Sequence, residues 1–374
     1  MKRTSLALNR FVVYAFYWAV FMTRLLGAMS LSFDYKRQRF ILQTKFQHLY
    51  CAVVHTLYLI ILPLAVCSDY MQEAAYGQQK FFILLNVLIT VLRLPALILT
   101  LAGTWLGRKN MFILINRFEA LRLRYFHTLN EKQRNKILKR NDMLVILKMI
   151  TSLSLMFTFY VRTLMVVEKP SLRFLLFTIY FGILEALCLF KMNFFFIGMC
   201  YANCILRYVR LELCEYERGV IKFPRIEDLI GIYLQTSGLV KRLTHIFQWE
   251  ILSILFAGMV AMVSLFFNYI VWCQKNDLQQ LSVYTCGFLF LGFLASLVNL
   301  NDVVLIAYIC CNTIKCAKRI RDVLLVLHIQ PQYQGDEVLQ KEVSLYIKTE
   351  YDNLVEFVFF LFFCSSTSWP GSCH

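Results

Sequence analysis

The chain has 374 residues, of which 59% are apolar and 17% are charged, and its formal net charge is +16. Soluble domains carry about a quarter of their residues as charged side chains, so this composition excludes a soluble protein and predicts a polytopic membrane protein. The basic balance does not indicate nucleic acid, because no aromatic–basic RNA-binding signature or zinc-finger spacing accompanies it; cations in cytoplasmic loops facing anionic lipid headgroups explain it better.

The amino-terminal segment is predicted to stay on the cytoplasmic side. Three cations precede the apolar run Phe11–Met22, as they do in a signal peptide. Arg24 interrupts that run, however, and a second basic cluster follows at residues 36–45. We therefore expect residues 11–29 to form an interfacial or re-entrant helix. If this helix crossed the membrane, the number of spans would change and the end of the chain would switch sides.

The first two spans are predicted at Leu49–Val66 and Phe81–Gly103, joined by a short acidic outer loop. The stretch Leu106–Asp142 then carries ten Lys and Arg residues against three acidic ones. A basic loop between two apolar runs of membrane length is predicted to be cytoplasmic, because Lys and Arg resist translocation. Within this loop, apolar residues recur at helical spacing and predict an amphipathic helix: Met111, Leu114, Ile115, Phe118 and Leu121.

The third span is predicted at Met143–Val167 and is followed by a tight outer turn. The fourth begins near Leu172 and stays apolar to Leu206, which is roughly 50 Å of helix at about 1.5 Å per residue. The hydrocarbon core is only about 30 Å thick. Because charged residues continue beyond Leu206, we expect this helix to project into the cytoplasm.

The second half of the chain repeats the pattern of long helices with basic inner ends. Pro224 is predicted to start an amphipathic helix that leads into the fifth span, Ile251–Cys273. The sixth span is predicted at Leu281–Cys311 and is followed by a basic inner segment. Further helices are predicted at Arg319–Ile329 and Glu337–Lys348, with a break at Pro331–Gly335. A seventh apolar run follows at Leu354–Phe363.

The distribution of cations supports this layout. Segments assigned to the inside hold 31 of the 39 Lys and Arg residues, outer loops hold 4, and 4 lie within spans. This asymmetry predicts an all-α protein with seven transmembrane helices and a cytoplasmic amino terminus. Four regions are predicted: a cytoplasmic segment at 1–48, a six-helix bundle at 49–311, a cytoplasmic anchor at 312–350, and a short last span with an atypical tail at 351–374.

Polar residues inside spans are the candidate functional residues, because a charge in the bilayer is costly and by default marks function. Three interpretations remain open: pairing that holds helices together, such as Arg93 with Glu185; a ligand or ion site; and snorkelling. Lys148 and Arg162 lie close enough to span ends to snorkel to the interface. The candidates are Arg93, Glu185, Lys191, Asn299 and Asp302.

Nothing in the sequence predicts an enzyme, a metal site or a cofactor. It has no nucleophile–base pair and no Gly-rich phosphate loop, and its six His are scattered. Most of the 13 Cys lie in apolar runs, where Cys behaves as a small hydrophobe. Cys67 and Cys273 fall near predicted outer ends and could form a disulfide.

G-protein-coupled receptors are excluded, because their amino terminus is outside and their Asp-Arg-Tyr and Asn-Pro-x-x-Tyr motifs are missing here. Over about residues 10–348 the chain instead resembles the insect gustatory receptor family of chemosensory receptors. The resembling parts, in order, are Leu25–Gly27 and Phe33–Tyr35 with the basic Lys36–Arg39, the long basic loop, the overlong fourth helix, and Arg319–Ile329 followed by Glu337–Lys348.

The resemblance implies a function and an assembly. Proteins of this family are ligand-gated cation channels made of four subunits, which would here be identical copies or other gustatory receptors. Each subunit contributes its last helix to a central pore, and the cytoplasmic helix ends pack as an anchor. A pocket among the spans, open outward, binds a small-molecule tastant. The implied location is the plasma membrane of gustatory receptor neurons.

One part departs from the family. Its last helix ends with Thr-Tyr, five apolar residues and Gln-Phe, and this motif is missing here. Leu354–Phe363 is only ten residues and includes Glu356, so pore residues cannot be assigned. We expect the carboxy terminus to be truncated or replaced, through splicing, a damaged gene or a mistaken gene model. The alternative functions are a multi-pass transporter, although no half-to-half repeat supports one, and a non-conducting receptor variant.

Overall fold

The computed structural model describes residues 21–27, 31–34, 39–42, 45–66, 80–126, 131–165, 171–217, 224–275 and 283–329. The chain divides into two compact units. The first unit comprises Met1–Ala202 and Gly238–Ile306, and the second comprises Asn203–Ser237 and Ala307–His374. The expectations for residues 1–20, for Glu337–Lys348 and for Leu354–Phe363 lie outside the described residues.

Helices account for nearly all of the described residues. Their bounds are Lys45–Val66 (α2), Lys80–Leu106 (α4), Arg108–Phe126 (α5), Glu131–Met165 (α6), Leu172–Glu217 (α7), Pro224–Lys275 (α8) and Val283–Ile329 (α9).

Five segments of the described chain are long and apolar enough to cross a membrane, judged by length and composition. They are Lys45–Leu64, Ile137–Val161, Leu172–Cys214, Asp228–Val263 and Phe290–Leu324. Helix α4 adds a shorter apolar segment, Arg93–Leu106. The chain is therefore a polytopic membrane protein, as its composition predicts. The count of seven crossings and the orientation stay predictions.

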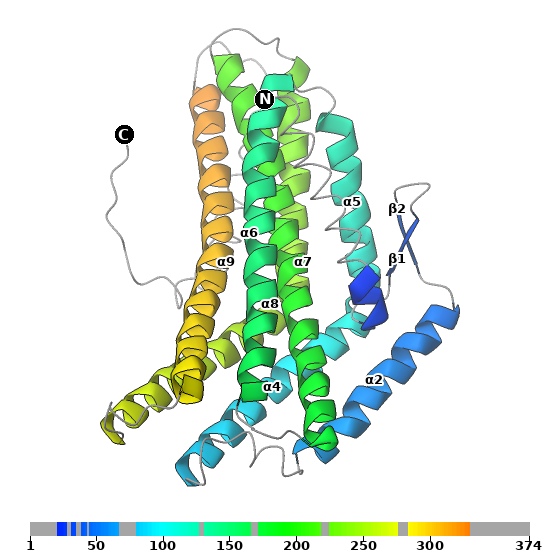
Figure 1. Cartoon of the computed structure of the whole chain (residues 1–374). Coiled ribbons are helices and arrows are strands. Elements are labelled where there is room, and N and C mark those ends of the chain that lie inside the picture. Colours follow the sequence, from blue (N-terminus) through cyan, green and yellow to red (C-terminus); the bar gives the residue numbers. More distant parts are fainter. Residues whose placement is uncertain are drawn as a thin grey trace. The chain divides into compact units, whose positions relative to one another are not determined.

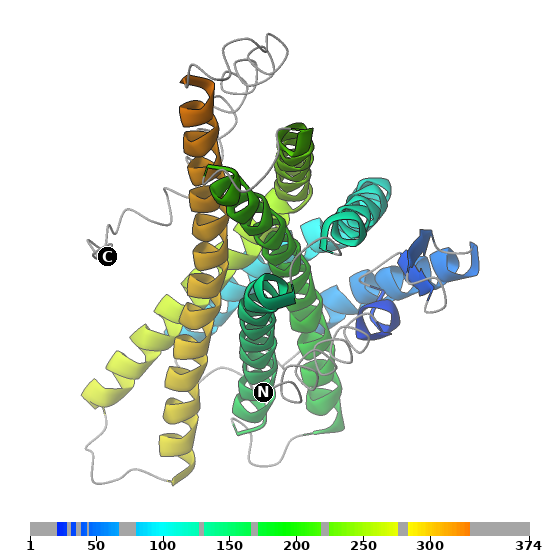
Figure 2. The same cartoon turned by 90° about the horizontal axis from the view of Figure 1, so that it is seen from above.

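The long helices extend beyond the predicted spans. Helix α7 begins after Ser171, whose Oγ accepts a hydrogen bond from the Phe174 amide at 3.1 Å and so caps the first turn. It runs for 46 residues, about 70 Å at 1.5 Å per residue, and passes through the charged residues that follow Leu206 (Figure 2). The expected continuation of this helix is confirmed.

Helix α8 confirms a second prediction about continuity. It begins at Pro224, where the fixed φ of proline suits the first position of a helix. It then runs unbroken to Lys275, so the predicted amphipathic helix and the predicted fifth span are one element of 52 residues. Helix α9 likewise joins the predicted sixth span to Arg319–Ile329 in one helix.

The all-α prediction misses a small antiparallel hairpin. Strand β1 (Leu31–Asp34) pairs with β2 (Arg39–Leu42), in the register Leu31↔Leu42 and Phe33↔Phe40. Apolar and polar residues alternate along β1 with the period of two that a β-strand requires, whereas in β2 three apolar residues follow Arg39. Each strand is only four residues long, so the alternation is too short to stand out beside the neighbouring basic cluster. Strand β2 contacts helix α5 (Figure 1).

Helix α5 follows α4 almost without interruption. Gly107 separates them, and its amide still donates to the Gly103 carbonyl at 3.0 Å. The predicted amphipathic face is confirmed, because Leu114, Phe118 and Leu121 are all buried. Helix α5 is therefore an amphipathic continuation of the apolar helix.

A network on α2 holds the preceding turn. The Tyr50 hydroxyl donates to the Leu25 carbonyl at 2.5 Å, and the Tyr58 hydroxyl lies 3.3 Å from the Leu26 carbonyl. The Trp105 indole N–H donates to Nδ1 of His55 at 2.8 Å. The His55 proton must therefore sit on Nε2, which donates to the Gly27 carbonyl at 3.0 Å.

The first unit has an apolar core where α2, α4 and α7 meet. Six side chains form it: Tyr58, Leu97, Leu101, Tyr180, Leu184 and Leu187. The Tyr180 hydroxyl donates to the Tyr58 carbonyl at 2.6 Å, which satisfies a buried polar group inside this core.

The second unit is built from the carboxyl-terminal parts of α7 and α9 and the start of α8. Buried apolar side chains come from all three segments, among them Ile205, Tyr233 and Ile320. The Asn203 amide lies 3.3 Å from the Thr313 hydroxyl, which links α7 to α9.

Large apolar side chains also lie exposed along the helices, as expected for a protein whose solvent is lipid. Examples are Phe157 on α6, Val263 on α8 and Phe290 on α9. In water such a surface would be an aggregation liability. In a bilayer, hydrocarbon chains cover it at little cost, which agrees with the membrane class assigned above.

Two glycines allow close helix approach in the first unit. A Cβ at Gly103 on α4 would fall on the carboxylate of Glu250 on α8. A Cβ at Gly198 on α7 would come within 2.8 Å of a Leu243 methyl group on α8. Small residues at helix contacts let backbones approach closely, and this is a common packing device in membranes.

Substitution of Gly103 tests this packing. Gly103→Ala should lower the free energy of unfolding by about 1–3 kcal/mol, because the added methyl displaces a buried carboxylate. The matched control is Gly238→Ala on α8, where a Cβ meets nothing within 4 Å. That change should be neutral or stabilising by up to about 1 kcal/mol, since Ala favours helix. Equal effects of the two substitutions in detergent-purified protein would contradict the close approach.

Candidate ligand pocket and its ion pairs

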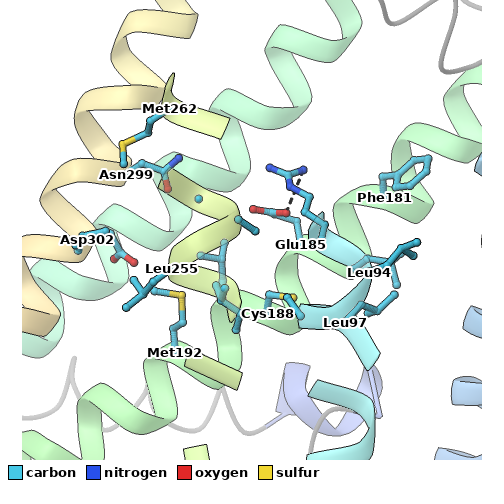
Figure 3. Close-up of a pocket in the computed structure, with 18 of the residues that line it drawn as sticks. Leu94, Leu97, Phe181, Glu185, Cys188, Met192, Leu255, Met262, Asn299 and Asp302 are labelled. Atoms are coloured by element: carbon cyan, nitrogen blue, oxygen red, sulfur yellow. Dashed lines mark ion pairs between the residues drawn. The ribbon is translucent and has the colours of Figure 1, made fainter. Parts of the chain in front are cut away.

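A pocket opens inside the first unit between α4, α7, α8 and α9, and Leu62 of α2 also lines it (Figure 3). Its volume is about 110 Å³. Most of its lining is apolar, with Leu97, Leu184 and Leu255 from three different helices. Four of the five candidate residues named from the sequence line this one pocket: Arg93, Glu185, Asn299 and Asp302.

Arg93 and Glu185 form the first ion pair of the pocket. Their side chains come from α4 and α7, and the guanidinium lies 3.5 Å from the carboxylate. This is the pair that the sequence offered as its example of helix pairing. The side chains are 41% and 31% exposed, so the pair lies at an accessible part of the pocket wall (Figure 3).

Asp302 contributes to a second, buried ion pair. The ammonium of Lys148 on α6 donates to Oδ1 of Asp302 on α9, and these side chains are only 2% and 3% exposed. The Thr151 hydroxyl lies 3.1 Å from the same oxygen. The prediction that Lys148 snorkels is therefore wrong. Its ammonium is held inside the protein because Asp302 offers a nearer counter-charge than the interface.

The polar face of α6 continues on both sides of Lys148. The Ser152 hydroxyl donates to Oδ1 of Asn193 on α7 at 3.0 Å. The Asn141 amide donates to the Cys200 carbonyl on α7 at 2.6 Å. Asn141, Lys148 and Ser152 recur at helical spacing along one face of α6. That spacing is the sequence signal that could have identified Lys148 as an inward-facing residue.

Lys191 lies outside the pocket lining and pairs with Glu250. Its ammonium is 3.7 Å from the Glu250 carboxylate, and the two side chains are 9% and 4% exposed. The ammonium also lies 5.9 Å from the centre of the Phe247 ring. The sequence analysis did not identify Glu250. That residue directly precedes the predicted fifth span, where a charged residue is expected to lie at the end of the span. The Lys191–Glu250 pair joins α7 to α8, and Gly103 on α4 leaves room for it.

No group of three or more His, Cys, Asp or Glu side chains within the described residues could hold a metal ion. Cys188, which lines the pocket, is a free cysteine. The expected Cys67–Cys273 disulfide falls outside the described side chains, as does the expected snorkelling of Arg162.

The model of the 7tm chemosensory receptor family matches residues 19–347. This range covers most of the chain, so the protein belongs to the 7tm chemosensory receptor family, the superfamily of insect gustatory and olfactory receptors. A search of curated proteins found no match. Membership makes the chain a membrane chemoreceptor, and the family is not a family of enzymes.

The two kinds of ion pair predict different costs of disruption. Lys191→Met leaves the Glu250 carboxylate buried without its counter-charge, and should lower the free energy of unfolding by about 3–5 kcal/mol. Arg93→Met is the matched comparison, because the Glu185 side chain is 31% exposed and the Glu250 side chain only 4%, so its loss should be the smaller of the two. Unfolding of detergent-purified variants measures both. A larger loss from Arg93→Met than from Lys191→Met would contradict this ranking.

Proposed function

We propose that the protein is a gustatory receptor, a ligand-gated cation channel subunit that detects small-molecule tastants for acceptance or avoidance. The observation that carries the proposal is the pocket in which Arg93, Glu185, Asn299 and Asp302 meet among apolar side chains. Ligand sites in proteins are mostly apolar cavities with a few convergent polar groups. The resemblance of the basic loop and the overlong fourth helix to gustatory receptors favours taste over smell.

The proposed orientation and assembly follow from charge and family. We place the amino terminus in the cytoplasm, because Lys and Arg gather in the loops assigned to that side. We place the protein in the plasma membrane of gustatory neurons, as a tetramer of identical subunits or with other gustatory receptors. The pocket then takes a tastant from outside the cell.

The pocket suggests how a ligand could act on the channel. Asn299 and Asp302 lie on α9, and the same helix continues to Ile329. A ligand that binds one arrangement of these side chains more tightly shifts the population toward it. We propose that α9 carries this bias from the pocket to the parts of the subunit that open the pore.

Filling the pocket tests the proposal. Leu255→Trp places an indole in the cavity, and should raise the half-activating concentration of any effective tastant by at least about tenfold. Leu252→Trp is the matched control, because Leu252 is exposed on the same helix and does not line the pocket. Cation current in a heterologous cell is the measurement, with surface expression of each variant checked by labelling.

Two results would contradict the proposal. One is saturable uptake of a compound without current, which would favour a transporter. The other is an equal loss of response in Leu255→Trp and Leu252→Trp at equal surface expression. The second result would mean that the tastant binds elsewhere.

A further inference from the structure

Two neighbouring polar groups on α9 face the pocket with unused hydrogen-bonding capacity. Lys148 and Thr151 both approach Oδ1 of Asp302, and no donor among the described residues reaches Oδ2. The side-chain amide of Asn299 likewise has no hydrogen-bond partner in the described part of the chain. Both residues line the cavity, and Asp302 is almost fully buried (Figure 3).

The spacing of these two groups suits a single small ligand group. Asn299 and Asp302 are three residues apart on a helix, so they share a face, with about 5–6 Å between Cβ atoms. An ionised carboxylate only accepts hydrogen bonds, whereas an amide N–H donates them. A hydroxyl can donate to Asp302 Oδ2 and accept from Asn299 Nδ2 at once. An ammonium can only donate, and an ether or carbonyl oxygen can only accept.

The charge balance of the pocket favours an uncharged ligand. Asp302 is already neutralised by Lys148, and Glu185 is neutralised by Arg93. A cationic ligand would therefore bring a buried charge without a free counter-charge, which is costly. A neutral hydroxyl uses the open Oδ2 without changing the balance.

The remaining walls limit the size and polarity of the ligand. Leu94 and Leu97 on α4 lie across the cavity from Asn299 and Asp302 (Figure 3). Further hydroxyl groups directed at such walls would lose their hydrogen bonds to water, so the pocket disfavours sugars. The volume of about 110 Å³ is below the roughly 150 Å³ of an apolar cavity that binds benzene, so it limits the ligand to one small ring or a short alkyl chain.

We propose that this pocket binds a small, uncharged alcohol or phenol. Its single hydroxyl lies between Asn299 and Asp302, and its apolar body lies against the leucines of α4, α7 and α8. The inference rests on the proposed function only in taking this pocket as the ligand site. Its test is binding to the purified chain, which does not require that a channel opens.

A set of matched probes separates the chemical classes. Benzyl alcohol donates and accepts, its isomer anisole only accepts, toluene does neither, and benzylammonium carries a charge. Binding is measured from the shift in unfolding temperature of the detergent-purified full chain against probe concentration. Benzyl alcohol should bind at least about tenfold more tightly than each of the others, because each of them leaves Asn299 or Asp302 with an unpaired polar group. D-glucose should produce no shift.

Variants assign the preference to the site. Asn299→Leu should reduce the preference for benzyl alcohol over toluene to about threefold or less, and leave binding of toluene unchanged or stronger. Asn301→Leu is the control, because Asn301 is exposed on the same helix and does not line the pocket. Leu255→Trp should abolish the shift by every probe and so separates pocket binding from partition into detergent.

The outcomes are decisive in both directions. Equal binding of toluene and benzyl alcohol, tighter binding of benzylammonium or glucose, or no binding by any probe would each overturn the proposed ligand class. If benzyl alcohol binds as expected and no ligand evokes current, the channel function fails while the ligand class stands.

Discussion

An unpaired charge is costly in the hydrocarbon core of a membrane. This cost favours ion pairs between helices, and such pairs connect the helices of the first unit. Its three interhelical ion pairs among the described residues join α4 to α7, α7 to α8, and α6 to α9. Helices α4, α7, α8 and α9, which supply most of the pocket lining, therefore each carry at least one charge whose partner is on another helix. Apolar packing alone specifies helix partners weakly in a membrane, because lipid tails are as apolar as leucine. The charges supply the missing specificity.

Asp302 connects this stabilising role with the pocket. One of its carboxylate oxygens is occupied by Lys148 and Thr151, and the side chain also lines the cavity. A residue that supports the fold and faces a ligand cannot be exchanged freely, because its loss leaves Lys148 buried and uncompensated. Lys191 and Glu250 do not line the pocket, so this pair supports the packing of the helices without facing a ligand. Among the ion pairs described in the first unit, Lys191–Glu250 thus belongs to the packing alone, whereas Arg93–Glu185 and Lys148–Asp302 border the pocket.

Much of this arrangement could be predicted from the sequence, because the membrane imposes patterns that a single chain displays. The long apolar runs, the continuation of α7 past Leu206 and the start of α8 at Pro224 all follow from local rules. Polar residues are rare inside apolar runs, and this identified the candidates Arg93, Glu185, Asn299 and Asp302 from the sequence. Their convergence on one cavity could not be predicted, because it depends on how α4, α7 and α9 pack. Glu250 and Lys148 were missed for a related reason: near a span end, a charge that reaches water and a charge that turns inward have the same local sequence.

The central claim, that charges pair across helices to hold the first unit together, is tested most directly by a double-mutant cycle on the Lys148–Asp302 pair. Lys148→Met and Asp302→Leu should each lower the free energy of unfolding of the detergent-purified chain by about 3–5 kcal/mol, because each leaves one buried charge alone. The double variant removes both charges and should be more stable than the sum of the single losses implies, by at least about 2 kcal/mol. Losses that simply add in the double variant would contradict the account, since they would mean that the two charges do not interact.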